Sequence, residues 1–147
     1  MAKARRTLTV VLPGYRRDRE QWRRGILAKV LEVARDDGIQ YSRDEFLEVV
    51  VLLYLGRRDK EKRLAIHDVD NRLKDILDAL QGRLGRSSSP ERLIENDNKI
   101  RRVVMEKQLT PKGLGDDFGG KLMIRPYKRH RWPLQATKGH GLRDPRG

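Results

Sequence analysis

The chain alternates between two spacings of apolar residues, one typical of β-strands and the other typical of α-helices. Residues 7–12 have apolar side chains at every second position and stop at Pro13-Gly14, which predicts a strand followed by a turn. Across residues 18–37 the apolar side chains recur three and four positions apart, which predicts an amphipathic helix ending at Gly38. Residues 45–55 are rich in β-branched and aliphatic side chains and predict a second, well-buried strand.

The second half of the chain continues this alternation. A charged loop at 56–63 leads to residues 68–80, whose apolar side chains fall on one face of a predicted helix. The polar stretch 81–96 predicts an extended loop, and the segments 99–109 and 121–127 predict two strands joined by a glycine-rich hairpin connection. The order strand, helix, strand, helix, strand, strand predicts an α/β (α+β) fold, with a small mixed sheet of about four strands and two helices packed on it.

The length of 147 residues suits one folded domain with a modest core. We expect this domain to span residues 1–127 and to be followed by a basic, flexible tail at 128–147. The longest apolar run, 49–55, is too short to span a bilayer. The chain has no cysteine, which excludes disulfides and thiolate zinc sites. The lack of cysteine fits a reducing compartment. We expect a cytoplasmic protein with no membrane partner and no small-molecule cofactor.

The formal net charge of +13 indicates a polyanionic partner, and nucleic acid is the commonest such partner. Aromatic residues make up only 5% of the chain and are not interleaved with the basic ones, which favours contact with backbone phosphates over base stacking. One dense group of cations precedes the second predicted helix, and we expect it to lie near bound DNA. This group, the loop cations, consists of Arg57, Arg58, Lys60, Lys62 and Arg63.

Two aspartates, Asp68 and Asp70, flank one apolar residue at the start of the second predicted helix. They can cap that helix and oppose its dipole, or they can bind magnesium, which prefers carboxylate oxygens. On a helix Asp70 and Lys74 lie one turn apart and reach toward the same spot. The lysine can form an ordinary surface ion pair, or it can neutralise charge on a phosphoryl transition state. Two carboxylates are too few for a metal site, so a third must come from elsewhere in the chain.

The sequence of the second predicted helix also resembles a known family. The run Asp68-Val-Asp-Asn-Arg-Leu-Lys-Asp-Ile-Leu-Asp-Ala-Leu80, followed by Asn96-Asp-Asn-Lys-Ile100, resembles the RusA family of Holliday junction resolvases. That family has a D-x-D-N-x-x-K…L-D-A-L block and then an acidic pair leading into a strand. The stretch 81–96 is longer here than in the family pattern.

The resemblance implies a magnesium-dependent endodeoxyribonuclease that works as a homodimer and nicks two strands of a four-way junction symmetrically. Manganese is expected to substitute for magnesium. The catalytic residues implied by the family motif are Asp68, Asp70, Lys74 and Asp97, and the three aspartates are the implied metal ligands. We expect the loop cations, Asn71 and Lys107 to contact DNA. This interpretation requires the three aspartates to be gathered into one pocket.

Two other hypotheses compete with the nuclease. A non-catalytic, basic nucleic-acid-binding protein would use the aspartates only to cap a helix. A basic interaction protein of a ribosome or phage particle would account for the tail but not for the ordered acidic residues. Trp132 lies within the predicted tail with no evident core to join, and we assign it no role.

Overall fold

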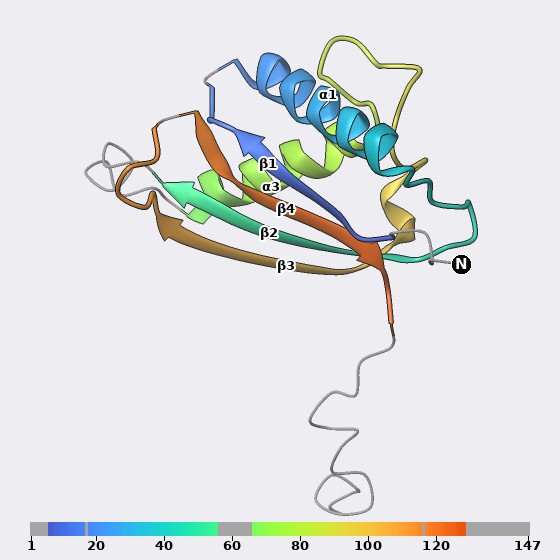
Figure 1. Ribbon diagram of the computed structural model, residues 1–147. Helices are drawn as coiled ribbons and strands as arrows, with labels where there is room; N and C mark the ends of the chain where they lie inside the picture. Colours follow the sequence, from blue (N-terminus) through green and yellow to red (C-terminus); the bar gives the residue numbers. More distant parts are fainter. Residues whose placement is uncertain (1–5, 17, 56–65, 116, 129–147) are drawn as a thin grey trace, which may run out of the picture.

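The computed structural model describes residues 6–16, 18–55, 66–115 and 117–128, and for residues 66–69 it describes the helix but not the side chains. The predicted mixed sheet with two helices packed on it is confirmed (Figure 1). The elements in chain order are β1 (Leu8–Pro13), α1 (Arg19–Asp37), β2 (Leu47–Leu55), α3 (Ile66–Leu80), the short 3-10 helix η1 (Asp97–Lys99), β3 (Ile100–Leu109) and β4 (Phe118–Pro126). Within these residues no helix is long and apolar enough to cross a membrane.

The four strands lie in the order β1-β4-β2-β3. β4 is antiparallel to both of its neighbours, and β2 runs parallel to β3. The predicted hairpin between the last two strands is therefore wrong, because β2 lies between them. A parallel pair such as β2 and β3 needs a crossover connection, and α3 lies within it.

β4 also begins earlier than predicted, at Phe118 instead of residue 121. Its glycines suggest a turn in the sequence, but the structure uses them where backbones approach closely. A Cβ on Gly119 would lie 2.0 Å from the Pro13 carbonyl oxygen, and a Cβ on Gly120 would lie 1.9 Å from that of Leu52. Only residues without side chains fit at these two positions.

Both helices cover the same face of the sheet (Figure 1). Alternate strand residues on this face are buried, since successive side chains of a strand point to opposite sides. The most deeply buried residues include Leu8, Val10, Leu12, Val49, Val51, Leu53, Leu122 and Ile124 from the strands, and Trp22, Ile26, Val30, Ile76, Ala79 and Leu80 from the helices.

On the uncovered face the sheet holds a buried carboxylate. Glu48 on β2 is 2% exposed and pairs with Arg102 on β3 and with Arg125 on β4. Both arginines lie directly opposite Glu48 in the strand register. One acidic side chain thus links three adjacent strands.

The first helix begins and ends as predicted. The Asp18 side chain accepts a hydrogen bond from the Gln21 amide at 3.2 Å, and Gly38 ends the helix in the left-handed conformation at φ 65°. The predicted loop 81–96 packs against this helix: the Ser87 hydroxyl donates to Glu20 at 3.0 Å, and Ile94 is 5% exposed. This longer loop is therefore part of the folded domain.

Candidate functional site

The acidic block identified in the sequence lies on the first turns of α3. Asp70 and Lys74 are exposed and lie one helical turn apart, as predicted. Asp70 is the fifth residue of the helix. The free backbone amides of a helix belong to its first four residues, and capping side chains precede them. Capping therefore does not account for Asp70. The Asp68 side chain lies outside the description.

Buried ion pairs fix α3 against α1. Arg23 donates to Asp75 at 2.8 Å and pairs with Asp78 at 3.2 Å, and Arg19 donates to Asp75 at 2.9 Å. Asp75 is 1% exposed, and its hydrogen bond raises the pKa of Arg19 above the ordinary value. Removal of one partner from such a cluster leaves a buried charge uncompensated. The exposed face of α3, which carries Asp70 and Lys74, is thus held in position by the ion pairs that Asp75 and Asp78 form with α1.

The first turns of α3 are also fixed to the end of β1. The Arg72 guanidinium lies 3.9 Å from the centre of the Tyr15 ring, and that ring packs edge-on against Trp22 with centroids 5.0 Å apart. The Trp22 indole donates to the Pro13 carbonyl at 3.0 Å. Because Pro13 ends β1, the start of α3 lies at the end of the sheet where β1 and β2 finish.

Lys107 lies on the helix-covered face of the sheet, near the end of the sheet where α3 begins. It is opposite Leu53 of β2 in the parallel register, and Leu53 is buried beneath the helices. Lys107 itself is exposed, and so is Asn71 on α3. The structure therefore brings Asp70, Lys74 and Lys107 to one end of the domain. The loop cations lie outside the described residues.

Asp97 lies at the opposite end. It opens η1 just before β3, whose first residue, Ile100, is opposite Leu47 at the start of β2. Residues 93 and 94 donate to the carbonyl of Leu80, the last residue of α3. β2 has nine residues, so its two ends are roughly 26 Å apart at about 3.3 Å per residue. Within one chain, Asp97 is not brought to Asp70.

The described side chains accordingly contain no group of three or more His, Asp or Glu residues that could hold a metal ion. The carboxylates of a single chain, as far as they are described, do not fit the magnesium site that the family resemblance implies. Asp70 and Asp97 are both exposed and remain accessible to groups from outside the chain.

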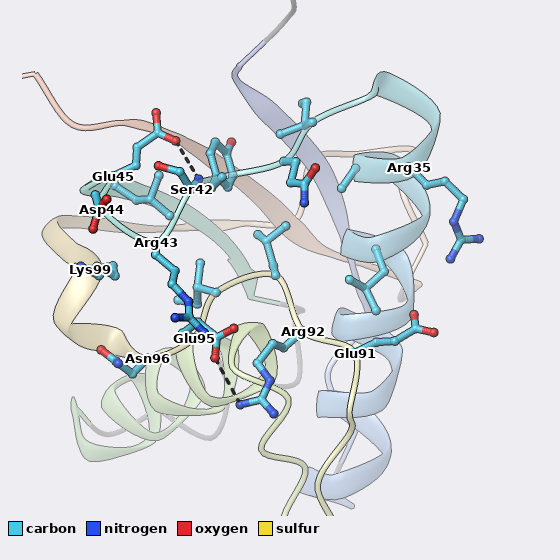
Figure 2. A pocket seen from close by; sticks show the side chains of 18 residues that line it. Arg35, Ser42, Arg43, Asp44, Glu45, Glu91, Arg92, Glu95, Asn96 and Lys99 are labelled. Carbon is cyan, nitrogen blue, oxygen red and sulfur yellow. Dashed lines mark hydrogen bonds and ion pairs between the residues drawn. The ribbon is translucent and has the colours of Figure 1, made fainter.

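The Asp97 end contains a pocket that the sequence did not predict (Figure 2). The pocket has a volume of about 700 Å³ and lies between the end of α1, the segment 39–45 and the loop 91–96. Its rim has four basic and four acidic side chains, from Arg35, Arg43, Arg92, Lys99, Asp44, Glu45, Glu91 and Glu95. Figure 2 shows Arg43, Arg92 and Glu95 together at its mouth, where Arg92 and Glu95 form an ion pair of 3.9 Å.

The ion pairs between α1 and α3 were not predicted, although the spacing of their residues in the sequence contains a trace of them. Arg19 and Arg23 are four positions apart, and Asp75 and Asp78 are three apart, so each pair shares one helix face. Their partnership across two helices could not be deduced from either segment alone.

Comparison of the sequence with protein-family models and with curated proteins found no match. The family resemblance therefore depends on the motif residues themselves.

Proposed function

We propose that this chain is a magnesium-dependent, structure-specific endodeoxyribonuclease that resolves four-way DNA junctions by symmetric nicking. The observation that carries the proposal is the placement of Asp70 and Lys74. Both are exposed, they lie one turn apart on a helix that buried ion pairs hold in place, and Asp70 is too far into the helix to cap it. An exposed carboxylate beside an exposed lysine can serve phosphodiester hydrolysis.

The roles of the side chains follow from their chemistry. Asp68 and Asp70 would hold a divalent cation together with a third carboxylate. Such a cation, when bound, supplies a hydroxide nucleophile and stabilises the leaving oxygen. Lys74 would neutralise charge on the scissile phosphate, and Lys107, on the same side and end, would bind a neighbouring phosphate. The net charge of +13 favours a polyanionic substrate.

The third carboxylate would come from Asp97 of a second copy. β3 is an edge strand of the described sheet, and its Val103 and Leu109 are 38% and 51% exposed. Two copies joined along β3 by a two-fold axis would run antiparallel. The start of β3 in one copy would then lie beside the start of α3 in the other, and the dimer would have two equivalent composite sites. Symmetric nicking needs such a pair of sites. Action on cellular DNA implies a cytoplasmic protein that associates with the nucleoid.

The test uses synthetic four-way junction, linear duplex and single strand, each with and without magnesium. We expect cleavage of the junction alone, in magnesium, and we expect Asp70→Asn to bind the junction without cutting it. Asp36→Asn, which changes an exposed aspartate on α1, is the matched control and should cut normally. Cleavage by Asp70→Asn at the wild-type rate would contradict the proposal.

A non-catalytic nucleic-acid-binding protein is the second candidate. The separation of Asp97 from Asp70 within one chain favours it. This candidate predicts salt-sensitive binding, no magnesium-dependent cleavage of any of the three substrates, and an Asp97→Asn variant that behaves as the wild type. Product bands that disappear in Asp97→Asn would exclude it.

A further inference from the structure

The described chain ends beside the pocket at the Asp97 end. The Tyr127 amide donates to the Phe46 carbonyl at 2.8 Å, just after the last residue of β4. The residues on either side of Phe46, Glu45 and Leu47, both line the pocket. The chain is therefore fixed to the border of the pocket at the point from which residues 128–147 continue.

We propose that the segment Trp132-Pro133-Leu134 of the same chain docks in this pocket, with the Trp132 indole on its apolar floor. Trp132 is the one Phe, Tyr or Trp that follows Tyr127 in the sequence. It lies five positions after Tyr127, which gives a reach of up to about 17 Å. The segment is thus tethered at the border of the pocket and has apolar side chains within reach of it.

The pocket suits such an occupant in volume and in chemistry. About 700 Å³ lies in the range of pockets that bury most of a bound group. Apolar side chains contribute to its lining, from Leu31, Ala34, Ile39, Leu47, Leu93 and Ile94. A buried indole gains from apolar contact and needs an acceptor for its N–H, and the rim carboxylates offer acceptors. The rim has equal numbers of acidic and basic side chains, so burial of the apolar side chains is the driving force.

Docking would have a consequence for the surface around Asp97. Asn96 and Lys99, on either side of Asp97, line the same pocket. The docked segment would hold the basic residues 128–131 beside this end of the domain, where they add cations for phosphate contact. The docking itself does not depend on the proposed nuclease activity.

The experiment measures acrylamide quenching of Trp132 fluorescence in the full chain. The chain has two tryptophans, and Trp22 is 1% exposed, so the difference between the wild type and Trp132→Phe isolates the signal of Trp132. We expect a quenching constant several-fold lower than that of a free peptide of residues 126–147. Leu31→Asp, which places a charge on the half-buried pocket wall, should raise the constant to the value of the peptide. Ala28→Asp, at an exposed position of the same helix outside the pocket, should leave it unchanged.

Three results would overturn the proposal. They are a wild-type Trp132 that is quenched like the peptide, a Leu31→Asp variant that folds and still protects Trp132, and a protection that rises with protein concentration, which would assign the pocket to the tail of a second copy. A second measurement needs no pocket variant. Nuclear Overhauser contacts from the Trp132 indole to the methyl groups of Leu31 and Leu93 are expected, and their absence would contradict docking.

Discussion

The Arg23 guanidinium donates to the Asp75 carboxylate at 2.8 Å and so joins α1 to α3 at a point where Asp75 is 1% exposed. Arg23 is itself buried, with 11% of its side chain exposed. Because the proposed catalytic residues lie on the exposed side of the same helix, the geometry of the candidate site depends on this internal contact.

Asp75→Ala should therefore lower the free energy of unfolding by about 3–5 kcal/mol, because it leaves the buried Arg23 without its main partner. Urea-induced unfolding measures the effect. Arg92→Ala is the control, since it breaks the exposed Arg92–Glu95 pair, and should cost less than about 1 kcal/mol. Equal losses in the two variants would show that the buried pair does not hold the helices together.

Gly120→Ala should destabilise the sheet through a backbone clash. Gly120 and Gly113 both have positive φ, at 138° and 91°, but only Gly120 has a neighbour in the path of a Cβ, the Leu52 carbonyl oxygen at 1.9 Å. We expect Gly120→Ala to cost at least about 2 kcal/mol more than Gly113→Ala. Thermal unfolding of both variants tests this, and similar melting temperatures would contradict the close approach of β4 to β2.

Alkaline pH should destabilise the protein through Tyr41. Burial raises the pKa of its hydroxyl from 10.0 to about 12 in the folded state, where the hydroxyl donates to the Ile124 and Arg6 carbonyls. A folded-state pKa above the unfolded value gives stability that is complete below about pH 10 and is lost as the pH rises toward 12. The difference in unfolding free energy between the wild type and Tyr41→Phe should shrink between about pH 10 and pH 12. A constant difference would mean that the hydroxyl titrates alike in both states.

Two inactive variants should restore cleavage when they form mixed dimers. If Asp70 and Asp97 meet across the dimer, a dimer of Asp70→Asn with Asp97→Asn contains one doubly defective site and one intact site. We expect nicking of one junction strand, at roughly a quarter of the wild-type yield, because half the dimers are mixed and each has one intact site.

The matched control combines Asp68→Asn with Asp70→Asn. Both changes lie in the same half of the proposed site, so no intact site can form and the mixture should stay inactive. No nicking in the first mixture, when both variants bind junction DNA, would place each site within a single chain. Restored nicking in this control would show instead that Asp68 and Asp70 belong to different sites, which contradicts the proposed arrangement.

Local patterns predicted the elements well because each is decided by residues close together in the sequence. The alternation of residues 7–12 and the three-four spacing of 18–37 gave β1 and α1 to within a residue. These patterns did not predict the features of the fold that depend on tertiary packing. Gly119 and Gly120 indicate a turn locally, yet they lie within β4 because neighbouring backbones need the space of a missing side chain.

The candidate site could likewise be predicted only where its residues lie close together in the sequence. The sequence placed Asp70 and Lys74 one turn apart, since helix geometry alone fixes that relation. It could not place Asp97 relative to them, because that distance depends on the parallel pairing of β2 and β3 and on the direction in which the crossover helix runs.

The pairing of Glu48 with Arg102 also fixes how β3 is aligned along β2. A slip of β3 by one residue would turn Arg102 toward the helices, and the buried carboxylate would lose a partner. At the same place Arg101 is the extra residue between the partners of Leu47 and Glu48, and its guanidinium lies 3.9 Å from the centre of the Phe46 ring. A misaligned β3 would therefore leave a buried charge without its partner. The ion pair at Arg102, five residues after Asp97, thus sets the position of Asp97 along the sheet.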